Sequence, residues 1–109
     1  LNGGPGCSSL LGFGSEHGPV IYNEKTEKLE INNFSWNKNA NIIYLESPAG
    51  VGFSKGSESD IPTDDVRSGI DNLSALKSFF KKYPKYMNND FYISGESYAG
   101  IYVPTLAYN

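Results

Sequence analysis

Cysteine, histidine and clustered basic residues are all scarce in this sequence. Cys7 is the single cysteine, so no bridge can form within the chain, and its thiol is either reduced or paired with a cysteine outside these residues. The nine Lys and Arg residues are scattered and the formal net charge is -3, which argues against a nucleic-acid surface, where basic side chains gather on one face. No apolar run approaches the ~20 residues of a membrane-spanning helix, so no membrane segment is expected.

The composition is that of a globular protein, with 39% hydrophobic and 19% charged residues in a chain of 109. The sequence contains no internal repeat and no low-complexity stretch. Its first six residues resemble the end of a strand that enters a glycine-rich loop, and residues 98–109 resemble a helix that has just begun. We therefore expect residues 1–109 to be one domain or part of one, cut at both ends.

Three short segments have the pattern of β-structure. Residues 19–22 and 28–31 flank a polar stretch and predict a β-hairpin. Residues 41–46 form a β-rich apolar run, typical of a strand covered on both faces, and residues 91–94 form a second such run. Residues 50–54, rich in glycine, predict a close backbone turn.

A long amphipathic helix is predicted over residues 63–83. Apolar residues recur there at intervals of three and four, namely Val66, Ile70, Leu73, Leu76, Phe79, Phe80 and Tyr83. Thr63, Asp64 and Asp65 suit its start, and Pro84 ends it. Strand, helix and strand in this order form a βαβ unit, which predicts an α/β fold with a parallel sheet.

Ser97 lies between the second β-rich run and an apolar helical segment. A nucleophile elbow turns so tightly from strand to helix that the residues two before and two after the serine must be small. Gly95 meets this need, whereas Ala99 is a mild departure from the glycine of the simple G-x-S-x-G pattern and is followed by Gly100. The alternative is that Ser97 only caps the helix that follows, because serine is a favoured N-cap residue.

The chain also begins with a glycine-rich segment. Glycines around Pro5 allow the backbone to approach a ligand and to present N–H groups outward, as an oxyanion hole requires. In an α/β-hydrolase one donor is the N–H after the nucleophile and the other comes from an earlier strand-to-helix loop. This assigns Tyr98 and the loop at Gly3 and Gly4, whereas the alternative is an ordinary tight turn.

Three segments resemble the serine carboxypeptidases, a family of the α/β-hydrolase fold. They are LNGGPGCSSL at 1–10, LESPAGVGFS at 45–54 and NDFYISGESYAGIYVP at 89–104, in the family's order. The resemblance implies an α/β-hydrolase fold with a mostly parallel central sheet, of which residues 1–109 are the N-terminal part of the catalytic domain. It further implies that Ser97 is the acylated nucleophile and that the N–H groups of Gly4 and Tyr98 form the oxyanion hole.

The resemblance also implies a site for the free C-terminal carboxylate of a peptide substrate. Its members are Asn2, the Gly3 N–H, Glu16 and Glu96. Two ionised glutamates would repel a substrate carboxylate, so at least one of them holds a proton, which predicts a preference for acid pH. The alternative for Glu16 is a solvated loop acid.

The general base of the serine is not found among these residues. In α/β-hydrolases the acid and then the histidine follow the serine, and the 12 residues after Ser97 contain neither. His17 precedes it and is interpreted as a polar loop residue. We expect the 109 residues alone to have no peptidase activity.

Cys7 is, by the same resemblance, the disulfide partner of a cysteine elsewhere, which implies a secreted, vacuolar or lysosomal protein. Two sequons, at Asn33 and Asn72, are compatible with glycosylation, although Asn72 falls inside the predicted helix. Phe34 and Trp36 are expected to be core residues rather than a binding platform.

Three functions are compatible with the sequence. The first is a serine carboxypeptidase that releases C-terminal residues from peptides through an acyl-enzyme, with no metal or other cofactor. The second is a related acyltransferase that passes the acyl group to an alcohol. The third is a non-catalytic binding relative. The intact set for carboxylate binding favours the first.

Overall fold

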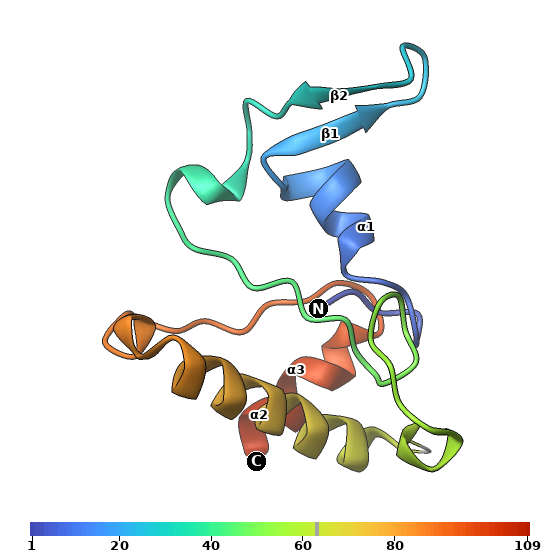
Figure 1. Cartoon of the computed structure of the whole chain (residues 1–109), viewed down its shortest axis with the longest axis vertical. Helices are drawn as coiled ribbons and strands as arrows, with labels where there is room; N and C mark the ends of the chain where they lie inside the picture. Colours follow the sequence, from blue (N-terminus) through green and yellow to red (C-terminus); the bar gives the residue numbers. More distant parts are fainter. Residues whose placement is uncertain (63) are drawn as a thin grey trace.

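Two helices that pack side by side form the base of the molecule (Figure 1). The computed structural model describes residues 1–62 and 64–109. Helix α2 spans Asp65–Lys82 and helix α3 spans Ala99–Tyr108. The Asp64 carboxylate caps α2 by accepting a hydrogen bond of 2.7 Å from the Arg67 N–H. The helix predicted over 63–83 is therefore confirmed, except that Thr63 lies outside the described residues.

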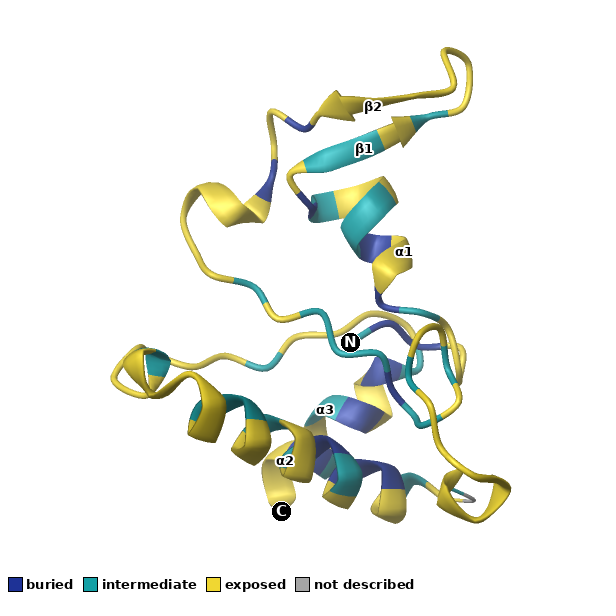
Figure 2. Cartoon of the chain, viewed as in Figure 1, coloured by how far each residue is buried: buried dark blue, intermediate teal, exposed yellow. Residues whose placement is uncertain are grey.

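Small and polar residues of α2 face α3. Ser68, Gly69 and Asn72 are its buried residues, and a Cβ atom built on Gly69 would lie 2.8 Å from the Thr105 methyl carbon. Figure 2 shows the buried residues of both helices along this contact. By contrast, the apolar residue Val66 is 63% exposed. The N-terminal end of the apolar stripe that predicted the helix is thus exposed.

A second part of the molecule contains the hairpin. Strand β1 spans Val20–Asn23 and pairs antiparallel with β2, Lys28–Ile31, so the predicted hairpin is confirmed. The short helix α1, Leu10–Gly12, continues into a π-helical turn, Phe13–His17, that carries the chain to β1. The sequence pattern did not predict this helical segment, because it is too short to have a period. Three 3₁₀ turns complete the elements, at Trp36–Lys38, Glu58–Asp60 and Pro84–Tyr86.

The two β-rich runs, at 41–46 and 91–94, form no strands in the described residues, so the predicted βαβ unit is not confirmed. The only sheet of the described residues is the antiparallel hairpin. Both runs extend toward the N-terminus (Figure 1), and a cavity of about 760 Å³ is lined by residues of both. A strand exists only when a neighbour at ~4.8 Å accepts and donates its backbone hydrogen bonds. Within the described residues the first run has no such neighbour, and the second is bonded only at its end, where the Ser94 carbonyl accepts from the Leu1 nitrogen.

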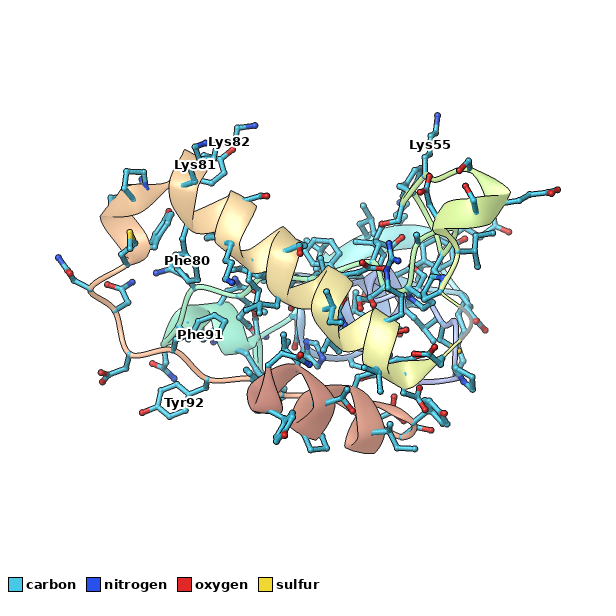
Figure 3. The ribbon with its side chains drawn as sticks, turned by 90° about the horizontal axis from the view of Figure 1, so that it is seen from below. Lys55, Phe80, Lys81, Lys82, Phe91 and Tyr92 are labelled. Carbon is cyan, nitrogen blue, oxygen red and sulfur yellow. The ribbon has the colours of Figure 1, made fainter. Side chains whose placement is uncertain are left out.

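The C-terminal half of α2 is tied to the second run by an aromatic pair. The rings of Phe80 and Phe91 meet edge to face with their centroids 5.4 Å apart, below Lys81 and Lys82 in Figure 3. Such pairs contribute about 0.5–1.5 kcal/mol beyond their area. This contact fixes the segment that leads to Ser97 relative to α2.

The aromatic residues of the hairpin side are exposed. Phe34 is 89% exposed and Trp36 is 55% exposed, so the prediction that they belong to the core was wrong. The described residues supply no layer over this side of the chain, and an apolar side chain is buried only when another element covers it. Among residues 1–62 and 64–109, no helix is long and apolar enough to cross a membrane.

Candidate active site

Ser97 has the backbone conformation of a very tight turn. Its φ is 59°, in the left-handed region that L-residues other than glycine rarely adopt. The residue is exposed, and its hydroxyl makes no hydrogen bond within the described chain. Residues held in this region store about 1–3 kcal/mol of strain and occur preferentially at functional sites. The strained serine therefore presents an unpaired hydroxyl at the surface.

The small residues around Ser97 are needed for this turn. A Cβ atom built on Gly95 would overlap the Ala99 methyl group and would lie 3.0 Å from the Leu1 carbonyl oxygen. Hydrogen bonds from the Ala99 N–H to the Glu96 carbonyl, 3.1 Å, and from the Gly100 N–H to the Ser97 carbonyl, 2.9 Å, close the turn. The requirement for small residues two before and two after the serine is confirmed.

Ser97 does not cap helix α3. The N-cap position is Tyr98, and no side chain there accepts a hydrogen bond from the first turn. The Tyr98 hydroxyl instead donates to the carboxylate of Asp65, at 3.0 and 3.2 Å from its two oxygens. This hydrogen bond raises the pKa of Tyr98 and joins the start of α3 to the start of α2. The alternative that Ser97 is only a capping residue is therefore wrong.

The glycine-rich loop lies directly against the serine turn. A Cβ atom built on Gly3 would lie 2.8 Å from the Glu96 carbonyl oxygen and would overlap the Tyr98 nitrogen. Gly4 has a φ of 118°, and the loop is closed by a 2.9 Å hydrogen bond from the Cys7 N–H to the Gly3 carbonyl. Within the described chain, neither the Gly4 nor the Tyr98 N–H donates to a protein acceptor. Both N–H groups are therefore free, and the loop that contains Gly4 lies against the turn that contains Ser97 and Tyr98.

The side chains predicted to bind a carboxylate lie around one cavity. Asn2 is buried, and its Nδ2 donates to Glu96 Oε2 at 3.5 Å. Asn2, Glu16 and Glu96 all line the cavity of about 760 Å³ between the two extended runs. The amide and the two carboxyl side chains of this set thus line one cavity, and the residues that follow Asn2 and Glu96 in sequence, Gly3 and Ser97, are not among its lining residues.

His17 is built into an aromatic cluster. Its ring stacks on Trp36 and Tyr44, with centroids 4.7 and 5.5 Å away, and its Nδ1 lies 3.0 Å from the Tyr44 hydroxyl. Burial raises the pKa of Tyr44. The Nε2 atom is 3.8 Å from Glu16 Oε2, and no contact with Ser97 occurs in the described residues. His17 is therefore an ordered residue of the cavity wall rather than the base of Ser97.

Glu46 is a further residue of the site, and the sequence pattern did not indicate its role. Its carboxylate accepts hydrogen bonds from the Ser8 hydroxyl at 2.5 Å, the Phe53 N–H at 2.8 Å and the Leu10 N–H at 3.4 Å. Burial acts to raise the pKa of Glu46, but the hydrogen bonds outweigh it and leave the pKa below its ordinary value. The available signal was an acidic residue at the end of an otherwise β-rich apolar run, four residues before a glycine-rich turn. That turn, predicted over 50–54, is confirmed by 3₁₀-type hydrogen bonds.

The remaining candidates are Cys7 and the two sequon asparagines, which differ in exposure. Cys7 is exposed and has no disulfide partner within the described residues. Asn33 is exposed, whereas Asn72 is 3% exposed and faces α3, which disfavours a glycan at the second sequon. No group of three or more His, Cys, Asp or Glu side chains in residues 1–62 and 64–109 is arranged to hold a metal ion.

A serine in the left-handed conformation between an extended segment and a helix, with small residues on either side and a glycine loop against it, has the geometry of the α/β-hydrolase nucleophile elbow. The family model for serine carboxypeptidases matches residues 1–109. The chain belongs to the serine carboxypeptidase family.

Relatives across eukaryotes match the chain along almost its whole length. The chain is 51% identical to the lysosomal protective protein of Mus musculus and 53% identical to the serine carboxypeptidase-like 21 protein of Arabidopsis thaliana, covering 98% of this chain in both cases. A prohormone-processing carboxypeptidase from Saccharomyces cerevisiae superposes with a TM-score of 0.90 at 34% identity, over 99% of this chain. The chain spans 23%, 22% and 24% of the length of these three proteins.

Proposed function

We propose that the protein containing these residues is a serine carboxypeptidase that removes C-terminal residues from peptides through an acyl-enzyme. The observation that carries the proposal is the strained, exposed Ser97 with the Gly3–Gly4 loop against it. Family membership supports the same reaction. Because the chain spans about a quarter of its relatives, we propose that residues 1–109 are one part of a larger catalytic domain.

In the proposed acylation step, the Ser97 oxygen attacks the carbonyl carbon of the last peptide bond. The negative charge that develops on the carbonyl oxygen is stabilised by the N–H groups of Gly4 and Tyr98, which are free to donate. The C–N bond then breaks, the C-terminal amino acid leaves with a proton, and water hydrolyses the ester on Ser97. The base that moves these protons comes from outside the 109 residues, because His17 is held by Trp36 and Tyr44.

Recognition of the substrate's terminal carboxylate is proposed for Asn2, the Gly3 N–H, Glu16 and Glu96. Asn2 donates to Glu96, and Glu16 lines the same cavity. For this set to accept an anion, one glutamic acid must be protonated and donate to it. The proposal therefore includes a preference for peptides with a free C-terminus and for acidic pH.

We propose that the two extended runs belong to a mostly parallel central sheet in the longer protein. The Leu1 nitrogen donates to the Ser94 carbonyl at 3.1 Å, and the Leu1 carbonyl accepts from the Glu96 N–H at 3.2 Å. In a parallel ladder, one residue bonds to the two residues on either side of its partner. Here Leu1 bonds to Ser94 and Glu96, which lie on either side of Gly95. A strand that precedes Leu1 would continue the ladder along the cavity between the runs.

The partner of the enzyme is proposed to be the C-terminus of a peptide or protein, with no metal or other cofactor taking part. One relative is named as a lysosomal protein, and another, from Schizosaccharomyces pombe, is named carboxypeptidase Y. We propose a route through the secretory pathway to a vacuole, a lysosome or the cell exterior. The exposed Cys7 is proposed to form a disulfide with a cysteine beyond these residues, as such compartments allow.

The proposal is tested with the full-length protein, its Ser97→Ala variant and two peptides that differ only in a free or amidated C-terminus. Mass spectrometry should detect loss of the last residue from the free peptide, slower loss from the amide and no reaction with Ser97→Ala. An acyl ester offered with an alcohol gives the second readout. Transfer to the alcohol without peptide cleavage would indicate the acyltransferase, and no reaction with any substrate would indicate a binding protein.

A further inference from the structure

The carboxylate of Glu46 joins two loops that are distant in sequence. On one side it accepts from the Ser8 hydroxyl and the Leu10 N–H, both of which follow the glycine-rich segment 2–7. On the other side it accepts from the Phe53 N–H, 2.8 Å away. A side chain with a single acceptor atom could not make both connections, because separate oxygens, Oε1 and Oε2, face the two loops.

The turn after Glu46 is shaped to receive this carboxylate. A Cβ atom built on Gly52 would overlap Glu46 Oε2, and Gly52 has a φ of 55° that favours glycine. The Ser54 hydroxyl also donates to the Glu46 carbonyl at 2.6 Å. The backbone of the turn therefore wraps around the side chain and holds it in one orientation.

A second set of hydrogen bonds links the glycine-rich segment to the same extended run. The Asn2 N–H donates to the Ser9 hydroxyl at 3.2 Å, and this hydroxyl donates to the Leu45 carbonyl at 2.6 Å. Ser9 is 1% exposed. The two ends of the glycine-rich segment, at Asn2 and at Ser8, are thus both anchored to consecutive residues of one extended run, and the segment between them contains Gly4.

We propose that Glu46 is a positioning residue, which places the glycine-rich loop so that the Gly4 N–H faces the oxygen of the transition state. This inference rests on the proposed function, because it assigns Gly4 to the oxyanion hole. Glu46 does not touch the substrate and acts through Ser8 and Leu10. Its two oxygens fix the loop against the 50–54 turn, and a donor in an oxyanion hole acts only when it is held in place before the reaction.

The ionised form of Glu46 suits this role. Within the described chain no Lys, Arg or His lies within ion-pair distance of it, so its charge is balanced by hydrogen-bond donors alone. A neutral glutamine in its place would turn one oxygen into an NH₂ group, which can donate to the Ser8 hydroxyl but cannot accept from the N–H of Leu10 or Phe53. In either orientation one loop would therefore lose its backbone hydrogen bond to the side chain, while the shape of the side chain stays the same.

The test uses the full-length protein with the variants Glu46→Gln and Ser8→Ala and the double variant. Glu58→Gln is the matched control, because Glu58 is an exposed acid of the next 3₁₀ turn. For each protein, kcat and KM are measured on a peptide with a free C-terminus. The affinity for a peptide aldehyde, whose adduct with serine places an oxygen in the oxyanion hole, is compared with the affinity for the released amino acid.

If the oxyanion donor is misplaced, the enzyme should bind the transition state more weakly while its binding of the substrate and the product stays the same. Glu46→Gln should lower kcat and the aldehyde affinity by roughly 10- to 100-fold, with KM and product affinity nearly unchanged. Ser8→Ala should give a smaller loss of the same kind, and the double variant should lose no more than Glu46→Gln alone, since both changes break one connection. Glu58→Gln should match the wild type.

The proposal is overturned if folded Glu46→Gln has the wild-type kcat, or if product affinity falls as much as aldehyde affinity. If Glu46→Gln does not fold, the same measurements are made on Ser8→Ala. An unchanged kcat in Ser8→Ala also overturns the proposal. Wild-type protein that cleaves no peptide would instead refute the proposed function, so the two failures are distinguished by the first measurement of the series.

Discussion

Gly3 lies so close to Tyr98 that no side chain fits between them. A Cβ atom there would overlap the Tyr98 nitrogen, and the Glu96 carbonyl oxygen would be 2.8 Å away. The obstructing atoms belong to the backbone, which cannot move aside as a side chain could. The contact brings a loop at residue 3 and a turn at residue 97 into a single site, and it follows that the site depends on the absence of one methyl group.

Gly3→Ala should therefore separate the loop from the serine turn. Displacement of a catalytic group by about 1 Å can cost roughly 100-fold in rate, and we expect a loss of this order in kcat/KM. The matched control is Gly100→Ala, because a Cβ at Gly100 meets nothing within 4 Å. It lies in helix α3 and should stabilise the protein by up to about 1 kcal/mol with unchanged activity. Equal activities of the two variants would contradict the account.

The backbone strain at Ser97 should appear as a difference in the free energy of unfolding between two variants. Ser97→Gly and Ser97→Ala both remove the hydroxyl and abolish activity, but only glycine adopts a φ of 59° without strain. We expect Ser97→Gly to be more stable than Ser97→Ala by about 1 kcal/mol in denaturant unfolding of the full-length protein. If Ser97→Ala is the more stable of the two, the left-handed conformation does not store strain.

Because of Glu46, the free energy of unfolding should decrease as the pH becomes acidic. Because its hydrogen bonds keep the pKa of folded Glu46 below the ordinary value, the ionised form adds stability that is fully present above the unfolded pKa of about 4.3. That contribution is lost as the pH falls through the folded pKa. Wild type should exceed Glu46→Gln in melting temperature at pH 6, and the difference should shrink below about pH 4. If the difference in melting temperature instead grows as the pH falls, the pKa of folded Glu46 is not lowered.

Asn2 should control recognition of the free C-terminus. Asn2→Leu keeps the branched shape of the side chain, with a larger volume, and removes the Nδ2 donor that contacts Glu96. We expect KM for a peptide with a free carboxylate to rise about 10- to 100-fold, with a much smaller change for the amidated peptide. Asn88→Leu, at an exposed position, is the control. Equal effects on both peptides would show that Asn2 does not read the carboxylate.

Local sequence patterns predicted the elements that local interactions stabilise. The hairpin and helix α2 appear within one or two residues of their predicted bounds, because a turn, a cap and a period are all encoded by nearby residues. The two β-rich runs were predicted as strands and form none, since a strand depends on partners that the described residues do not supply. Phe34 and Trp36 were misjudged for the same reason.

The candidate site was predicted in part. The small residues around Ser97 indicated a tight turn, and the glycine segment indicated free N–H groups, because both are steric requirements visible in the residue types. Glu46 was missed because its role arises from contacts with Ser8 and Phe53, which are distant or unremarkable in sequence. Similarly, no pattern indicates that His17 is stacked on Trp36.

The role of Ser97 as the nucleophile is tested most directly by treating the full-length protein with a fluorophosphonate, which reacts with activated serines, and by mapping the adduct with mass spectrometry. We expect one adduct, on Ser97, formed in step with the loss of C-terminal cleavage and absent from Ser97→Ala. An adduct on a different serine, or cleavage that continues in Ser97→Ala, would contradict this role.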